Sequence, residues 1–252
     1  MIEAVGAVFA GIGARGYFVR DIGRATAHPR TYGPEIISQM RKMGVDSLPL
    51  VAAVAAFIGA VTAVQTRFQL LPGVELSVVG LITRQSIVLE LGPLLTALVL
   101  TGRVGARITA ELGTMRVTEQ IDALETLAYD PVAYLVVPRL IATIVMVPLL
   151  TIFANSIGVV TAMFAADTVG VDRAAFTEGL RLSFGPFQIF YSLLKATLFG
   201  TAIAFFCSFE GFFAESGAEG VGRSTASAVV VTSVAILMLD ALTAVVLARY
   251  LI

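Results

Sequence analysis

Residues 140–166 carry no charged side chain, and this uncharged run constrains the fold more than any other feature of the chain. A membrane-spanning helix needs roughly 20 consecutive apolar residues, because the hydrocarbon core of a bilayer is about 30 Å thick. Pro138 stands before the run and Pro148 lies inside it, where neighbouring helices in a membrane can accommodate a proline. The run therefore predicts a membrane span that is long enough to tilt.

Four further apolar stretches predict four more spans. Two of them are interrupted by a single charge, Lys195 in one and Asp240 in the other. Hydrophobic residues make up 57% of the 252 residues and charged ones 14%, and the mean hydropathy is +0.89, which excludes a soluble domain. We expect an all-α polytopic membrane protein with about five transmembrane helices, the other four at residues 48–64, 87–112, 187–209 and 226–247.

The N-terminal part, residues 1–46, is expected to form interfacial helices in front of a transmembrane core at residues 47–252. Both parts together make a single domain, residues 1–252. In the N-terminal part, apolar residues recur at three- to four-residue intervals, as in a helix that lies along a membrane surface. These residues are Val5, Val8, Phe9 and Ile12. A second such segment is expected at residues 33–43.

The placement of lysine and arginine predicts the orientation, because cytoplasmic segments of membrane proteins carry an excess of basic residues. If the N-terminus lies in the cytoplasm, most of the 17 basic residues fall on the cytoplasmic side. These residues are Arg15, Arg20, Arg24, Arg30, Arg41, Lys42, Arg103, Arg107, Arg116, Arg139 and Arg223. We therefore expect a multi-pass protein with a cytoplasmic N-terminus.

A short amphipathic segment at residues 118–129 lies between the second and third predicted spans. It follows a helical face that carries Arg103, Arg107 and Glu111 at four-residue spacing. Thr118 is expected to cap this surface helix. Apolar side chains at three-residue intervals are expected to face the membrane domain or a partner groove, and these are Ile121, Leu124 and Leu127. A surface helix between two spans is suited to pass force to a soluble partner, to which it would offer Glu119, Gln120, Asp122 and Glu125.

No catalytic or nucleotide site is recognisable in the sequence. The glycine-rich residues 217–225 lack the GK[ST] sequence of a phosphate-binding loop and are expected to form a tight turn. His28 has no partner at metal-ligand spacing, and Cys207 is expected to be a small core residue. The net charge of −1 gives no indication of a nucleic-acid partner. We expect no enzyme activity, so the energy for transport would come from another subunit or from an ion gradient.

The chain resembles the MlaE-type (YrbE-like) permeases of lipid ABC transporters that work with MCE proteins. The resemblance covers roughly residues 45–250. Its central motifs are Leu91-Gly92-Pro93, Gly102-Arg103-Val104-Gly105-Ala106, Ala110-Glu111, Gly113-Thr114-Met115, residues 117–125, Asp130-Pro131 and the VVPR sequence that ends at Arg139. Further matches are Lys195, Phe199-Gly200, Cys207, Gly211, residues 217–225 and Asp240. The chain departs from the family at Leu89, where these permeases usually have an arginine before the glutamate; Arg84 could supply the missing charge.

The resemblance implies a permease subunit that moves phospholipid or a related lipid between the bacterial inner membrane and periplasmic MCE proteins. It implies a homodimer that binds a cytoplasmic ABC ATPase and a periplasmic MCE-domain protein, in some systems together with a STAS-domain protein. ATP and Mg would be bound by the ATPase, and no cofactor is expected in this chain. The lipid and the direction of transport are left open.

Three charges inside the predicted spans, Glu90, Lys195 and Asp240, are candidates for the lipid path, because a charge at this depth is costly and marks a functional site. Lys195 and Asp240 are at nearly the same predicted depth, so we expect an ion pair between them at the edge of a lipid cavity. Glu90 is expected near the outer end of the second span, where it would meet a lipid headgroup. The remaining cavity candidates are Gln65, Gln69, Val61, Val64 and Leu91.

Two other classes of protein fit the same charges. One is an ion-coupled secondary transporter, in which Glu90, Lys195 and Asp240 would relay protons or ions without an ATPase. The other is a membrane scaffold that transports nothing and would tolerate the loss of these charges. A requirement for ATP hydrolysis distinguishes the ABC permease from both.

Overall fold

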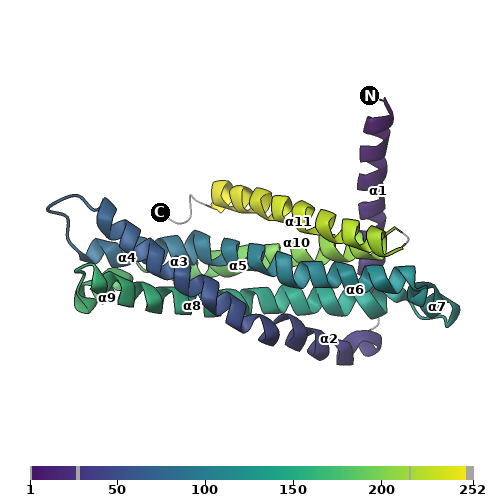
Figure 1. Ribbon diagram of the computed structural model, residues 1–252, viewed down its shortest axis with the longest axis horizontal. Coiled ribbons are helices and arrows are strands. Elements are labelled where there is room, and N and C mark those ends of the chain that lie inside the picture. Colours follow the sequence, from purple (N-terminus) through teal and green to yellow (C-terminus); the bar gives the residue numbers. More distant parts are fainter. Residues whose placement is uncertain (1, 27–28, 216, 248–252) are drawn as a thin grey trace.

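The computed structural model describes residues 2–26, 29–215 and 217–247, and all regular structure in these residues is helical. The long helices run side by side along the longest axis of the molecule, with α7 at one end and α9 at the other (Figure 1). The elements are α1 (Ile2–Ala25), α2 (Pro29–Met43), η1 (Val45–Ser47), α3 (Leu48–Gln69), α4 (Ser77–Gln85), η2 (Ser86–Leu91), α5 (Gly92–Leu100), η3 (Thr101–Gly105), α6 (Ala106–Val117), α7 (Gln120–Thr126), η4 (Val132–Val136), α8 (Val137–Thr168), α9 (Arg173–Arg181), α10 (Pro186–Phe212) and α11 (Gly217–Leu247).

Five stretches of helix in the described residues are long and apolar enough to cross a membrane, which confirms the five predicted spans. Each of them is longer than predicted, because the helices continue through polar residues beyond the apolar core, at both ends of the first four spans and at the N-terminal end of the fifth. Their bounds are Glu35–Gln69, Ser77–Val117, Val132–Thr168, Pro186–Phe212 and Gly217–Leu247. The prediction of a tight turn at residues 217–225 was wrong, since these residues form the first turns of α11.

The second span consists of α4, η2, α5, η3 and α6 in one continuous run. Two π-helical segments, η2 and η3, interrupt its α-helical geometry. Such segments are rare, and they often occur at functional sites because they change the direction in which side chains point. We had predicted Glu90 near the outer end of this span. Because α4 lengthens the span before η2, Glu90 instead lies well inside the helix.

The first span packs against the third through a close contact of two glycines. A Cβ atom on Gly59 of α3 would lie only 2.0 Å from the carbonyl oxygen of Gly158 in α8. Small residues let membrane helices approach closely enough for extensive van der Waals contact. This contact anchors α3 on α8 and leaves the opposite face of α3 open.

The helix α1 stands at a steep angle to the long helices (Figure 1). Its Phe18 is 2% exposed and packs against three aromatic rings of α10, those of Phe205, Phe209 and Phe212. The helix α2 covers the segment predicted at residues 33–43. It packs against α8, and its Gln39 and Met43 are buried. The residue His28 and the side chains of Val5, Val8, Phe9 and Ile12 lie outside the described part of the chain.

Candidate functional site

Three charged residues meet inside the helix bundle, and we call them the charged cluster. Lys195 of α10 is fully buried, and its Nζ lies 2.6 Å from Oε2 of Glu90 in η2. The same Nζ lies 2.6 Å from Oδ1 of Asp240 in α11. The predicted ion pair between Lys195 and Asp240 is therefore confirmed, and Glu90, for which no direct contact with Lys195 was predicted, is the third member of the cluster.

Two carboxylates for one ammonium group leave the cluster with an excess of negative charge. Lys195 also donates to the backbone oxygen of Leu89, at 3.3 Å. The ring of Tyr191, one turn earlier on α10, lies 5.1 Å from Nζ, and its hydroxyl lies 3.5 Å from Oε1 of Glu90. A buried charge in a membrane protein is stable only with partners of this kind.

The three members of the charged cluster differ in the fraction of the side chain that is exposed at the surface of the single chain. The side chain of Lys195 is 0% exposed, that of Asp240 is 17% exposed and that of Glu90 is 44% exposed. Glu90 lies 13 residues after the start of its span, or roughly 20 Å along the helix. A carboxylate that is half exposed at this depth needs water, a headgroup or another chain beside it.

The other predicted cavity residues lie in two separate places. An open groove of about 550 Å³, which we call the α3 groove, runs along the free face of α3. Its lining includes four predicted residues, Val61, Val64, Gln65 and Gln69, together with Ala60 and Phe68. Leu91 instead lines a separate recess of about 10 Å³, next to Ala55 and Gly158. In the single chain, the charged cluster and the α3 groove do not share one cavity.

Arg84 does not replace the arginine that is missing at position 89. Its guanidinium is buried and donates to the carbonyl oxygens of Leu180 and Leu182, each at 3.1 Å. It therefore holds the segment between α9 and α10 in place. The carboxylate of Glu90 is balanced by Lys195 instead.

The helix α7 lies in the predicted surface segment, but it starts differently from the prediction. Thr118 does not cap it, because its hydroxyl donates back to the carbonyl oxygen of Thr114 in α6. The residue before α7 is Glu119, which has φ 60° and turns the chain sharply out of α6. Ile121 is fully buried against the bundle, whereas Leu127 is 68% exposed.

The polar face of α7 is open to solvent. All four residues predicted to contact a soluble partner are exposed, and these are Glu119, Gln120, Asp122 and Glu125. Asp122 forms an ion pair of 2.6 Å with Arg116, the last basic residue of α6. The helix α7 therefore presents an acidic face while its buried side is fixed to the bundle.

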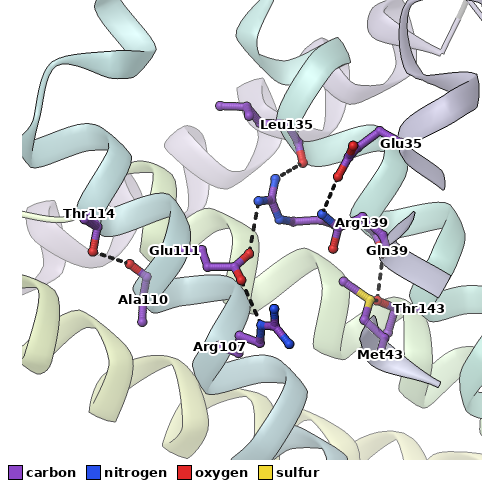
Figure 2. Close-up of polar contacts among 10 residues, drawn as sticks. All are labelled: Glu35, Gln39, Met43, Arg107, Ala110, Glu111, Thr114, Leu135, Arg139 and Thr143. Carbon is purple, nitrogen blue, oxygen red and sulfur yellow. Dashed lines mark hydrogen bonds and ion pairs between the residues drawn. The ribbon is translucent and has the colours of Figure 1, made fainter. Parts of the chain in front are cut away.

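A second ionic network lies at the end of the bundle that carries α7, which we call the α7 end. Glu111 of α6 accepts from Arg107 at 2.8 Å and from Arg139 of α8 at 3.2 Å, as Figure 2 shows. Arg139 is 4% exposed and also donates to the carbonyl oxygen of Leu135 at 2.6 Å. The four-residue spacing pointed to Arg103, Arg107 and Glu111, but it could not reveal that Arg139 of the next span is a partner of Glu111.

Comparisons with known proteins cover most of the chain. The model of the family "Permease MlaE" matches residues 36–246. The chain is 41% identical over 220 residues to a probable ABC transporter permease protein of Rickettsia prowazekii, covering 83% of this chain and 82% of that one. It is 32% identical over 213 residues to the intermembrane phospholipid transport system permease protein MlaE of Haemophilus influenzae, covering 84% and 82%. It is 33% identical over 207 residues to the chloroplastic protein TRIGALACTOSYLDIACYLGLYCEROL 1 of Arabidopsis thaliana, covering 81% and 59%.

Proposed function

The chain belongs to the MlaE permease family and is a multi-pass membrane permease, and we propose that it moves a phospholipid or a related lipid as the membrane-spanning subunit of an ABC transporter. The lipid class is supported by the name of the Haemophilus relative, which is a phospholipid transport permease. We further propose that the chain lies in a bacterial inner membrane with its N-terminus and α7 in the cytoplasm, in accordance with its basic residues.

The observation that carries this proposal is the half-exposed Glu90 in a paired cluster at bilayer depth. A polar lipid headgroup can donate to Glu90 or Asp240 and approach Lys195, while the acyl chains lie along the apolar part of the α3 groove. A second copy of the chain facing the cluster would enclose both regions in one cavity and shield Glu90 from hydrocarbon. We therefore propose a homodimer with the lipid path between its two subunits.

The partners follow from the same proposal. A cytoplasmic ABC ATPase that binds ATP and Mg would contact the acidic face of α7. A periplasmic MCE-domain protein would receive or deliver the lipid at the α9 end, and a STAS-domain protein could bind to the ATPase. The chain itself would hold no cofactor.

An ion-coupled transporter is the second candidate, and the charged cluster is the observation that favours it. Lys195 lies between two carboxylates at 2.6 Å each, an arrangement in which a proton could pass from one group to the next. Such a protein would transport in liposomes with an ion gradient and without ATP. The ABC permease would transport only with its ATPase and ATP.

The lipid path can be tested by photo-crosslinking from Gln65 in the reconstituted transporter. Gln65 lines the α3 groove, so a photoreactive side chain there leaves the charged cluster intact. We expect it to capture one class of lipid preferentially and to capture much less of it after ATP is added. The control is position Leu149 on α8, which is 50% exposed and lines neither the groove nor the cluster. Identical lipids and identical responses to ATP at the two positions would exclude a lipid path along α3.

The coupling role of α7 predicts a second result. Asp122→Arg or Glu125→Arg is expected to lower lipid transport at least tenfold while ATP hydrolysis by the partner continues. Both side chains are exposed, so reversing their charge has little effect on stability, in the range of about 0–1 kcal/mol. The measurement compares lipid transfer with phosphate release in the same proteoliposomes. The matched control is Glu178→Arg on α9, an exposed acid at the opposite end of the bundle. If the α7 variants transport lipid and bind the ATPase like the wild type, α7 is not the coupling helix.

A further inference from the structure

A small basic recess lies at the α7 end, between α2 and the second span. It is lined by Lys42 of α2, Arg103 of η3 and Arg107 of α6, with Gln39, Met43 and Glu111 beside them. Figure 2 shows Arg107 and Glu111 pointing from α6 toward the side of α2 that carries Gln39 and Met43. The enclosed volume is about 20 Å³, which is enough for one water-sized group. One oxygen atom of an anionic group would fit inside the recess, and the rest of the group would lie at its mouth, beside the exposed Lys42 and Arg103.

The recess has more positive than negative charge. Lys42 and Arg103 are exposed and form no ion pair in the part of the chain that the structure describes. Glu111 is the acid that lines the recess, and its carboxylate is already shared between Arg107 and Arg139. Two further acids lie nearby on the α2 side. Glu35 accepts a hydrogen bond from Gln39, and Asp46 is exposed without an ion pair to Lys42. Within the described residues, Lys42 and Arg103 therefore have no carboxylate as an ion-pair partner.

The depth of the recess points to the membrane interface. The uncharged stretch of the first span begins at Ser47, a few residues after Lys42 and directly after Asp46 of η1. In the second span, residues 91–102 are uncharged and Arg103 ends that stretch. Both cations thus lie where apolar helix gives way to polar residues, which is the level of lipid headgroups.

From these observations we propose that the recess binds the phosphate of an anionic membrane lipid, whose acyl chains lie against the bundle in the adjacent leaflet. Basic pockets between membrane helices on the cytoplasmic side are suited to anionic headgroups, and each lysine or arginine near the surface adds to the attraction. Arg103 lies 13 residues after Glu90 in one helix, or roughly 20 Å away. The bound lipid is therefore distinct from a lipid at the charged cluster, and this inference does not depend on which lipid the protein transports.

The test uses the full chain in its purified transporter complex, stripped of lipid in detergent. Phosphatidylglycerol and phosphatidylcholine with the same acyl chains are titrated separately, and bound lipids are counted by native mass spectrometry. We expect the wild type to prefer phosphatidylglycerol. In the double variant Lys42→Gln/Arg103→Gln the affinity for this lipid should fall roughly 25-fold, from about fivefold for each neutralised residue. Inorganic phosphate at millimolar concentration should not displace the lipid.

The matched control is Arg41→Gln, which neutralises the neighbouring residue of α2, exposed and outside the lining of the recess. It should change the affinity less than twofold. An equal loss with Arg41→Gln, or equal binding of the two lipids, would overturn the proposal. Displacement by inorganic phosphate would identify a site for a free anion instead. Binding by the isolated permease that is lost in the complex would mean that these cations contact an acidic partner protein.

Discussion

Replacement of Lys195 by methionine is expected to abolish lipid transport and to lower the free energy of unfolding by about 3–5 kcal/mol. The side chain of Lys195 is fully buried between Glu90 and Asp240, at 2.6 Å from each. Methionine fills the space but leaves the two carboxylates facing each other without a cation. The change in stability can be measured by denaturant unfolding in detergent, and transport by lipid transfer in proteoliposomes.

A triple variant separates stability from function at the charged cluster. Lys195→Met combined with Glu90→Gln and Asp240→Asn removes all three charges, so most of the lost stability should return. Transport should stay absent if the charges handle the lipid headgroup. The control Arg181→Met changes an exposed residue of α9 and should alter stability by no more than about 0.5 kcal/mol. A Lys195→Met variant with wild-type stability would contradict the pairing, and an active triple variant would contradict the functional role.

The number and order of the spans could be predicted from the sequence because a bilayer requires long apolar runs, and these are visible without any tertiary contact. The ends of the spans could not. Residues 77–86 extend the second span although Arg84 lies among them, because its charge is buried and bonded to the carbonyl oxygens of Leu180 and Leu182. Hydropathy counts that arginine as a surface residue, so the predicted span began too late.

The charged cluster was predictable only in part, for a related reason. The sequence gives the depth of a residue along its helix, and this was enough to place Lys195 beside Asp240. It does not give the direction in which a side chain points around the helix. Glu90 lies in the π-helical segment η2, which alters that direction. Its contact with Lys195 therefore appears only in the folded chain, although all three residues are isolated charges in apolar stretches.

Competition between two hydrogen bonds of the Thr118 side chain explains why the predicted helix cap was wrong. A threonine before a helix can accept from the backbone of the next turn, but its hydroxyl can also donate to the preceding turn. Here the second option prevails, at 2.8 Å from the carbonyl oxygen of Thr114. Glu119 then turns the chain with a positive φ of 60°. Sequence patterns located α7 correctly but could not decide between these two hydrogen bonds.

Substitution of Arg139 is expected to have the second large effect, because this residue connects the N-terminal part of α8 to α6 through its ion pair with Glu111. Its guanidinium is almost completely buried and bonds to Glu111 and to the carbonyl oxygen of Leu135. Arg139→Met removes both bonds and leaves Glu111 with the exposed Arg107 as its partner. We expect the free energy of unfolding to fall by about 2–3 kcal/mol, in the range for hydrogen bonds to charged groups. Lipid transport should fall more steeply than ATP hydrolysis, since α6 leads directly into α7.

The comparison with Arg107→Met makes this expectation specific. Arg107 contacts the same carboxylate, but 46% of its side chain is exposed, so its loss should cost no more than about 1 kcal/mol. A double-mutant cycle with Glu111→Gln should show strong coupling to Arg139 and weak coupling to Arg107. Equal effects of the two arginine substitutions would mean that burial adds nothing to the contact with Arg139. A large loss for Arg139→Met alone, cancelled in part by Glu111→Gln, would identify this ion pair as the rigid connection between α7 and the spans.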